Sequence, residues 1–387
     1  MSPLSRRLFI EKFGIGFGAT ASALTIPSIF NFAQASTEIY EGKKLNVALC
    51  GLGNYAEALA DGLLESKYCK LTGLITGHPA KAESWKKKYN VPDKNIYNYE
   101  NFDTIADNKD IDVVYVVLPN AMHKAFTIRA AKAGKHVICE KPMATSVKDC
   151  EEMISACKNA GVQLAIGYRL HFEPTHQEIM RLGQDKVFGQ VRFIEAGLGY
   201  KTYDTMLKTD SKSFDINAAS EWRLRKAMAG GGPLMDLGVY CIQASRYSLG
   251  EEPTSVTAQF GPTNDKIRFA QVEESITWQM EFPSGAMSAC TSSYGFNIDR
   301  FYAGADDGFF ELSPALSYGP FKGKTSKGQI NFPVINQQAA QLDGIGKLIL
   351  ENKPLPAHIT GEEGLKDIRV VEAVYKAAKT GSKILLK

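Results

Sequence analysis

A glycine-rich turn placed directly after an apolar strand restricts the folds open to this sequence. The run 45–50 is apolar and suits a strand buried on both faces. It leads into the G-x-G-x-x-A turn Gly51-Leu52-Gly53-Asn54-Tyr55-Ala56, which opens a helical pattern. In such a turn the first glycine permits the bend, the second lets the backbone approach a pyrophosphate, and the small third residue allows close helix packing. Because a helix N-terminus attracts phosphate, the turn predicts a dinucleotide site.

Strand and helix patterns alternate after this turn, as they do in parallel α/β sheets. Apolar runs predict strands at 70–75, 111–118, 136–139 and 163–166, with helices at 122–133 and 147–160. A chain of 387 residues suits about two domains. We therefore expect an α/β Rossmann domain with a parallel sheet at 44–166 and a second domain at 167–387.

The end of the second predicted strand indicates which dinucleotide is bound. NAD sites usually have an acidic residue there, which holds the ribose 2′-hydroxyl. This chain has Thr76-Gly77-His78-Pro79-Ala80-Lys81 instead. No carboxylate would repel a 2′-phosphate, and Thr76 and Lys81 could bind one, so the sequence favours NADP over NAD. The alternative for Lys81 is an exposed charge on the helix that carries Lys86-Lys87-Lys88.

Two later strands end in polar residues. One runs into Pro119-Asn120 and the next into Glu140-Lys141-Pro142. Ligands of open parallel sheets bind beyond the carboxyl ends of the strands, so we expect Asn120 and Lys141 to lie near the nicotinamide. The alternative for Lys141 is a surface ion pair with Glu140.

Residues 167–387 have the pattern of an α+β domain. Alternating stretches between 253 and 312 predict a large, open, mostly antiparallel sheet arranged as a meander. The open face of such a sheet suits the interface of a homo-oligomer. Before these strands, three glycines and Pro233 are expected to begin a helix, on which Asp236 and Tyr240 share one face. The alternative for this pair is a buried structural hydrogen bond.

The first 35 residues have the pattern of an export signal. Arg6 and Arg7 form a twin-arginine motif, a weakly apolar stretch follows at 14–30, and Ala33-Gln34-Ala35 resembles a cleavage site. We predict export of the folded protein by the Tat machinery to the periplasm, with a retained membrane anchor as the alternative. The seven cysteines lack metal-ligand spacing, and a net charge of +3 gives no basic field for nucleic acid, so neither partner is expected.

The motifs occur in an order that resembles a known family. The G-x-G-x-x-A turn, Pro119-Asn120, Glu140-Lys141-Pro142 and Asp236-x-x-x-Tyr240 resemble the Gfo/Idh/MocA family of NAD(P)-dependent sugar oxidoreductases. Gly167-Tyr168-Arg169, Glu221-Trp222-Arg223 and the glycines at 230–232 look like those of its periplasmic glucose–fructose oxidoreductases. The resemblance covers nearly all of the chain after the leader. It implies a site between two domains, a tightly held NADP and sugar substrates.

The resemblance also implies roles for individual residues. Tyr240 would be the general acid/base, Lys141 its charged partner and Asp236 an orienting carboxylate, and these three would bind sugar together with Tyr168. The residues expected to contact the cofactor are Gly51, Gly53, Asn54, Tyr55, Thr76, Lys81, Pro119, Asn120, His123, Glu140, Lys141, Trp222 and Arg223. A phenol is a weak base at neutral pH, but a nearby ammonium favours its phenolate, which could take the proton of an aldose C1 hydroxyl. For Trp222 and Arg223 a structural role is an equal alternative.

We therefore expect an NADP-dependent oxidoreductase that oxidises an aldose to its lactone and reduces a second sugar. The segment 36–44 is shorter than the Pro-rich arm of glucose–fructose oxidoreductases. The sequence therefore does not decide whether the cofactor is permanently retained, whether the protein is a tetramer or whether the second half-reaction occurs. The alternatives are an NAD-dependent glycosidase that oxidises C3 transiently, and a non-catalytic sugar or redox sensor with the same fold.

Overall fold

The computed structural model of the protein describes residues 42–201 and 219–386. The predicted signal peptide, residues 1–35, lies outside the described residues. Within the described ranges, no helix is both long and apolar enough to cross a membrane. All seven cysteines are buried and unpaired.

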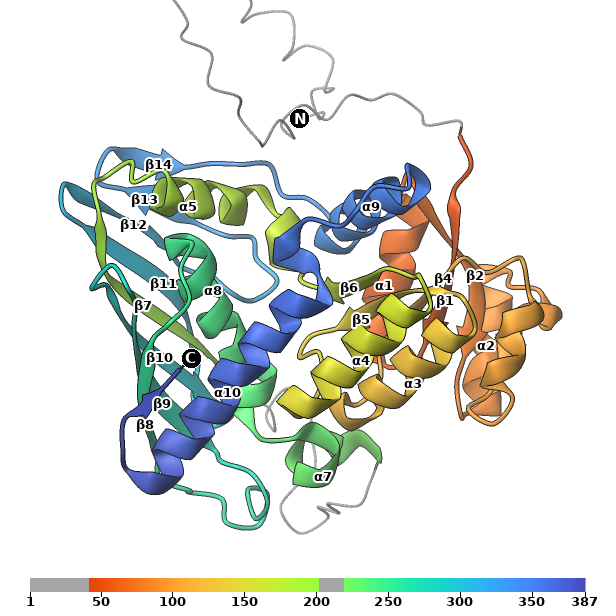
Figure 1. Ribbon diagram of the computed structural model, residues 1–387, viewed down its shortest axis with the longest axis horizontal. Coiled ribbons are helices and arrows are strands. Elements are labelled where there is room, and N and C mark those ends of the chain that lie inside the picture. Colours follow the sequence, from red (N-terminus) through yellow and green to blue (C-terminus); the bar gives the residue numbers. More distant parts are fainter. Residues whose placement is uncertain (1–41, 202–218, 387) are drawn as a thin grey trace, which may run out of the picture. The chain divides into compact units, whose positions relative to one another are not determined.

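The first half of the chain forms a six-stranded parallel sheet in the order β3-β2-β1-β4-β5-β6 (Figure 1). The strands are β1 (Leu45–Cys50), β2 (Cys69–Ile75), β3 (Ile96–Tyr97), β4 (Val113–Val116), β5 (His136–Glu140) and β6 (Leu164–Gly167). The central strands are covered on both faces, which explains why they are continuous apolar runs rather than alternating ones. This strand order is that of a Rossmann domain, so the predicted α/β fold is confirmed.

Helices connect these strands. They are α1 (Asn54–Glu65), α2 (Pro79–Tyr89), α3 (Asn120–Lys132) and α4 (Val147–Asn159), with short 3-10 turns η1 (Asp93–Asn95) and η2 (Phe102–Asp107). The third expected strand is shorter than predicted, since β4 covers only 113–116 of the apolar run 111–118. The chain leaves the sheet after Val116 and reaches α3 through the segment that contains Pro119.

The second half forms a nine-stranded mixed sheet in the order β14-β13-β12-β11-β7-β10-β9-β8-β15. The strands are β7 (Val191–Gly199), β8 (Ser255–Phe260), β9 (Ser275–Glu281), β10 (Met287–Ser293), β11 (Ile298–Ala305), β12 (Gly308–Leu312), β13 (Gly323–Thr325), β14 (Gly328–Ile330) and β15 (Ile384–Leu385). The large, mostly antiparallel sheet is confirmed. The expected simple meander is wrong, because β7 lies between β10 and β11 and pairs in parallel with β10.

Helices of the second half pack against this sheet and against the Rossmann domain. They are η3 (Arg169–Phe172), α5 (Pro174–Gln184), η4 (Ala219–Leu224), α7 (Lys226–Ala229), η5 (Leu234–Gly238), α8 (Val239–Leu249), α9 (Gln337–Leu350), η6 (Ala357–Ile359) and α10 (Gly361–Thr380). The segment with Asp236 differs from the expected α-helix, because η5 is a π-turn that continues directly into α8. Asp236 lies in the π-turn and Tyr240 in the first turn of α8.

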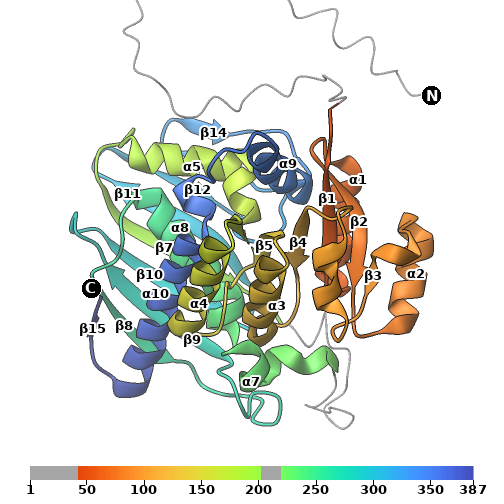
Figure 2. The ribbon, with the colours of Figure 1, turned by 45° about the vertical axis from the view of Figure 1, so that its right-hand side comes forward.

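The last two long helices return to the Rossmann domain. Helix α9 packs beside α1, and α10 lies between α4 and the large sheet (Figures 1 and 2). Leu342, Ile345 and Ile349 of α9 belong to the same buried apolar cluster as Val47 of β1 and Leu59 of α1. Residues about 280 positions apart thus share one core, and α9 forms part of the covering of the Rossmann sheet.

Candidate active site

The turn between β1 and α1 has the shape that a dinucleotide site needs. Gly51 has a φ of +105°, and a Cβ there would lie 2.5 Å from the carbonyl oxygen of Val117. At Gly53, by contrast, a Cβ would meet nothing within 4 Å, so the space beside its backbone is open. Gly53 is also the N-cap of α1 and has no side chain to accept from the first-turn N–H groups. These amides are therefore available to an anion, as pyrophosphate binding requires.

The first turn of α2, which follows β2, provides a positive charge close to this turn. The Nζ atom of Lys81 donates a hydrogen bond to the backbone oxygen of Leu52 at 3.2 Å, although the two residues are 29 positions apart. Thr76 is buried, and its hydroxyl oxygen accepts from the backbone N–H of His78 at 3.2 Å. The structure thus brings Lys81 onto the glycine turn, while Thr76 shapes the loop that leads to it. No acidic residue lies between 76 and 81.

Two residues expected to contact the cofactor, His123 and Asn120, form hydrogen bonds from their side chains to backbone oxygens of other segments. His123 is 1% exposed, and its ring nitrogens lie 2.7 Å from the oxygen of Leu118 and 3.0 Å from that of Pro142. It therefore fastens the loops after β4 and β5 to each other, and its contact with the cofactor stays a prediction. The buried amide nitrogen of Asn120 donates to the oxygen of Ala229 at 2.9 Å, which ties α3 to α7.

Lys141, Asp236 and Tyr240 come together from the two halves of the chain. The Nζ atom of Lys141 donates to the backbone oxygen of Asp236 at 2.8 Å and lies 3.5 Å from its Oδ1 atom. The same Nζ atom lies 4.4 Å from the centroid of the Tyr240 ring. Burial would lower the pKa of Lys141, but its electrostatic interactions with Tyr240, Asp236 and Glu140 together outweigh burial and raise that pKa. Lys141 is therefore a fixed positive charge at neutral pH.

The carboxylate of Asp236 is held from its other side as well. The Nε atom of Arg223 and the hydroxyl of Tyr294 donate to its Oδ2 atom at 3.1 Å and 2.9 Å. Burial would raise the pKa of Asp236, but the charges of Arg223 and Lys141 outweigh it, so the pKa lies below its usual value. Asp236 thus stays ionised and orients the two cations. The guanidinium carbon of Arg223 also lies 4.4 Å from the Trp222 ring centroid.

The contacts of Arg223 bear on the expected role of Trp222 and Arg223. Both were expected to contact the cofactor, with a structural role as the alternative. The guanidinium of Arg223 pairs with Asp236 and stacks on Trp222, so the structure favours the alternative for both side chains.

Glu140 lies directly before Lys141 and is buried. It accepts a hydrogen bond from the hydroxyl of Tyr115 at 2.5 Å, and that hydroxyl accepts from Nε2 of Gln341 on α9 at 2.6 Å. Burial raises the pKa of Glu140 to about 7, while Tyr115, Lys141 and Arg169 act in the opposite direction. Glu140 is therefore anchored in the protein behind Lys141, which fixes the segment that carries the lysine.

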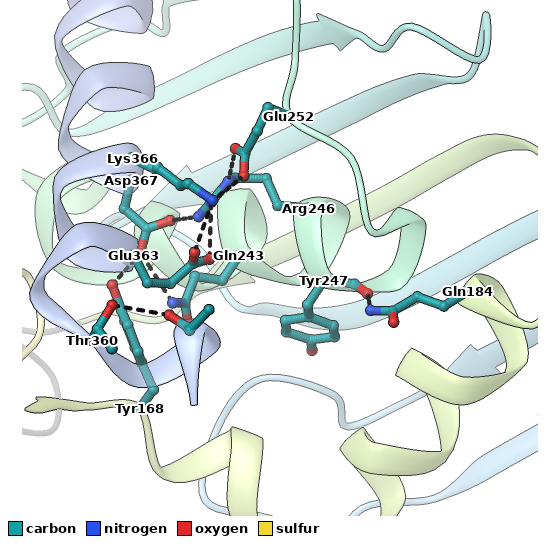
Figure 3. Close-up of polar contacts among 11 residues, drawn as sticks. Tyr168, Gln184, Gln243, Arg246, Tyr247, Glu252, Thr360, Glu363, Lys366 and Asp367 are labelled. Carbon is teal, nitrogen blue, oxygen red and sulfur yellow. Dashed lines mark hydrogen bonds and ion pairs between the residues drawn. The ribbon is translucent and has the colours of Figure 1, made fainter. Parts of the chain in front are cut away.

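Tyr168 belongs to a different cluster from the one that contains Lys141. Its hydroxyl donates to the carboxyl group of Asp367 on α10, beside Gln243 and Arg246 of α8 (Figure 3). Tyr168 is only 2% exposed. The hydroxyl of Tyr168 is thus committed to a buried carboxyl group, and its contact with a sugar stays a prediction.

Three residues that contact or adjoin Asp236 or Tyr240 were missed by the sequence analysis. They are Arg169, Tyr294 and Tyr318. The guanidinium carbon of Arg169 lies 5.3 Å from the ring centroid of Tyr240 and 4.4 Å from that of Tyr318. The Tyr318 ring in turn lies 6.4 Å from that of Tyr55, which follows the glycine turn. Arg169 adjoins the quoted Tyr168 and could have been singled out, whereas Tyr294 and Tyr318 are in segments without a motif.

Fold and site together define a class of protein. A Rossmann domain with an open glycine turn faces a fixed lysine, a carboxylate and a phenol supplied across the two halves of the chain. A bound dinucleotide would supply the acceptor or donor of a hydride, and a positioned phenol can move the accompanying proton. This combination is that of a dinucleotide-dependent oxidoreductase.

Comparison with known families identifies the group to which the chain belongs. The family model described as an oxidoreductase family with an NAD-binding Rossmann fold matches residues 45–168, and the GFO/IDH/MocA C-terminal domain matches residues 176–308. These matches cover more than half of the chain. The protein belongs to the Gfo/Idh/MocA family and is an NAD(P)-dependent oxidoreductase.

Individual relatives extend this comparison. D-xylose 1-dehydrogenase [NADP(+)] of Haloarcula marismortui is 26% identical over 328 residues, which is 82% of this chain and 86% of that protein. The crystal structure of aldose-aldose oxidoreductase from Caulobacter crescentus, complexed with glycerol, is 40% identical with a TM-score of 0.82. It covers 89% of this chain and 100% of its own. Scyllo-inositol dehydrogenase of Lactobacillus casei, at 19% identity, TM-score 0.71 and coverage of 89% and 99%, shows the fold alone.

Proposed function

We propose that this protein is an NADP-dependent sugar oxidoreductase that oxidises the C1 hydroxyl of an aldose to the lactone. The observation that carries the proposal is the contact of Lys141 with Asp236 and the Tyr240 ring, in a chain whose glycine turn is built for a dinucleotide. The names of two relatives, a D-xylose 1-dehydrogenase and an aldose-aldose oxidoreductase, support sugars as substrates.

The residues present suit the two parts of this reaction. A bound NADP would supply the acceptor for the hydrogen on C1 and its electron pair. Tyr240 would accept the hydroxyl proton, and the positive charge of Lys141 would stabilise its oxygen as the anion that can do so. Asp236 holds Lys141 in place, so the ammonium need not reorganise during the step.

NADP is preferred to NAD in this proposal because of Lys81. The 2′-phosphate of NADP would meet an ammonium on the glycine turn and no carboxylate. The NADP dependence in the name of the Haloarcula relative agrees with this choice. The first-turn amides of α1 would hold the pyrophosphate beside Gly53.

Coupling to a second sugar and export to the periplasm complete the proposal. The twin-arginine motif and the A-x-A site support export of a folded, cofactor-loaded protein by the Tat machinery. Outside the cytoplasm no pool would recycle a released dinucleotide, so a second sugar that takes up the hydrogen would regenerate it. The Caulobacter relative is named for a reaction between two aldoses.

We also propose that the open face of the large sheet joins two copies of the chain. It forms a hollow of about 650 Å³ whose lining includes Phe193, Thr277, Trp278 and Ile298. Phe193 and Met287 are 41% and 40% exposed on strands β7 and β10. Burying such side chains in a symmetric contact removes apolar surface from water. Sedimentation of the processed protein should therefore give a dimer or a larger assembly.

The test follows the ultraviolet absorbance of the reduced nicotinamide in the processed protein. Adding an aldose should raise this absorbance, and adding a ketose or second aldose should lower it again. Tyr240→Phe keeps the ring but removes the hydroxyl, so it should slow the rise by about 10²–10⁴-fold with little change in NADP affinity. Tyr302→Phe is the matched control, because its ring stacks on Phe309 in the large sheet.

The outcome also separates the alternatives. Cleavage of aryl glycosides without net reduction would indicate the NAD-dependent glycosidase. A cofactor that stays unchanged with every sugar would indicate the sensor. Near-normal turnover in Tyr240→Phe would remove Tyr240 from the mechanism.

A further inference from the structure

Arg169 is a buried cation whose contacts are all with uncharged groups. Its side chain is 2% exposed, and its Nε atom has no hydrogen-bond partner. Nη1 donates to Oε1 of Gln337 and Nη2 to the backbone oxygen of Leu316 at 3.2 Å. Within the ranges 42–201 and 219–386, no carboxylate forms an ion pair with it. Burying a charge without a counter-charge costs several kcal/mol.

The missing negative charge can come from Tyr240. The guanidinium carbon lies 5.3 Å from the Tyr240 ring centroid, and the Lys141 Nζ atom lies 4.4 Å from the same centroid. Burial lowers the pKa of Arg169, but Tyr240, Tyr55 and Tyr318 together outweigh it and raise that pKa, and Tyr240 contributes the most of the three. Among the groups that raise the pKa of Lys141, Tyr240 is again the largest. Both cations thus face one phenol.

The groups around Tyr240 come from every element packed on it. They are Glu140 and Lys141 after β5, Arg169 in η3, Asp236 in η5, Tyr55 in α1, Tyr200 after β7 and Tyr318 in the loop before β13. Asp236 is balanced by Arg223 at 3.1 Å. Arg169 forms no ion pair within the described residues, and its charge acts on the phenol as well as on the more distant carboxyl groups of Glu140 and Glu173.

We propose that Arg169 is a positioning residue that, together with Lys141, holds the oxygen of Tyr240 as the anion that takes the substrate's hydroxyl proton. This role rests on the proposed function, because it concerns the same phenol. Gln337 and Leu316 fix the guanidinium, so it cannot turn away to solvent. A lysine could supply the charge, but it lacks the planar guanidinium that donates to the oxygens of Gln337 and Leu316 while it lies beside the Tyr240 ring.

The test measures Tyr240 directly and needs no turnover. The ultraviolet absorbance of tyrosinate is followed as a function of pH in wild type and Tyr240→Phe, and their difference reports Tyr240 alone. The same difference is taken in an Arg169→Gln background. Removing the cation should raise the pH at which Tyr240 loses its proton by roughly 1–3 units. The acid limb of the kcat profile should move by the same amount, with the KM for the cofactor unchanged.

The matched control is the same substitution at an arginine that lies away from the site. Arg129 also lies over two aromatic rings, 4.7 Å from Phe102 and 5.1 Å from Phe126. Arg129→Gln should leave the titration of Tyr240 unchanged. If Arg169→Gln does not fold, Arg169→Lys and Gln337→Leu replace it, since both keep the charge but displace it. Each should raise the midpoint by a smaller amount.

The outcomes distinguish this inference from the proposed function. An unchanged midpoint in Arg169→Gln, or in both replacement variants, overturns the role of Arg169 whether or not the enzyme oxidises sugars. A loss of kcat that is equal at every pH also overturns it, because that result indicates a purely structural arginine. If Arg169→Gln shifts the midpoint but the wild-type protein oxidises no aldose, the effect of Arg169 on Tyr240 is supported and the proposed function is overturned.

Discussion

Single charges at the site are stabilised by opposite charges from distant parts of the chain. The carboxylate of Asp236 accepts hydrogen bonds from Lys141, Arg223 and the hydroxyl of Tyr294, which lie 95, 13 and 58 positions away in the sequence. Each contact satisfies a buried charge that would otherwise be costly. The spacing of Asp236 and Tyr240 could be predicted, because it is local. The partners of Asp236 could not, because nothing in the sequence marks which arginine or tyrosine will fold against it.

The residue that should discriminate between the two dinucleotides is Lys81. Lys81→Ala removes the ammonium from the glycine turn, so NADP affinity should fall about tenfold or more, since a charged hydrogen bond contributes about 1.5–3 kcal/mol. NAD lacks the 2′-phosphate and should bind nearly as before. Titration of both dinucleotides by protein fluorescence measures this difference.

Lys87→Ala is the control for this prediction. Lys87 is exposed on the same helix, and its loss should affect neither dinucleotide. Equal losses for NADP and NAD in Lys81→Ala would mean that Lys81 supports the turn rather than the phosphate.

Among the elements, the β1–α1 turn and the π-turn η5 position the two sides of the site. The β1–α1 turn is local, so the sequence predicted it. The π-turn was not predicted, because a distant residue defines its start. Both carboxylate oxygens of Glu273 accept backbone hydrogen bonds there, from Gly232 at 3.1 Å and Leu234 at 3.2 Å. Tyr375 of α10 donates to Glu273 at 2.8 Å and so links this start to α10.

Two glycines of the β1–α1 turn should respond differently to the same substitution. Gly51→Ala forces a Cβ to 2.5 Å from the oxygen of Val117 at a φ of +105°, so it should destabilise the protein by about 2 kcal/mol or more. Gly53→Ala places its Cβ in open space and should change stability by less than about 1 kcal/mol. The same methyl group would occupy the space beside the α1 amides and weaken dinucleotide binding.

Thermal unfolding and dinucleotide titration of both variants check this contrast. A stable Gly53→Ala protein with undiminished affinity would show that the pyrophosphate does not approach this turn. A Gly51→Ala protein as stable as wild type would show that the turn can rearrange.

In the whole molecule, the two sheets are joined by segments that return from the end of the chain. The positions of the helices α9 and α10 on α1 and α4 were not predicted from the sequence. The place of β7 between β10 and β11 was missed for the same reason. Periodicity in a sequence reports which face of an element is buried and not against which partner. Contacts between distant segments therefore needed the structure.

A charge cluster with Arg246 and Asp367 buried at its centre joins α8 to α10 and should make stability depend on pH (Figure 3). It contains the carboxyl groups of Asp367, Glu363 and Glu252 but only two cations, Arg246 and Lys366. Burial raises the pKa of Asp367 to about 7, Glu363 adds to the shift, and Arg246 opposes it. The cluster thus keeps one proton that balances its charges.

The sign of the pH effect follows from this proton. Unfolded Asp367 releases its proton near pH ~4, whereas the folded protein retains it up to about pH 7. Between these values the folded state binds more protons, so the contribution of Asp367 to stability falls as the pH rises. In Asp367→Asn nothing titrates at this position. The free energy of unfolding of wild type minus that of the variant should therefore fall by on the order of 4 kcal/mol from about pH 4 to about pH 8.

Denaturant unfolding at a series of pH values measures this difference. The buried imidazoles of His171 and His176, whose pKa values burial lowers, make the opposite contribution, but they are present in both proteins and cancel. Asp306→Asn, in an exposed pair with Arg192, is the control and should give no such trend. A difference that rises with pH would mean that Asp367 is ionised in the folded protein, held as an anion by Arg246. The link between α8, which carries Tyr240, and α10 would then be an ion pair that strengthens, rather than weakens, toward neutral pH.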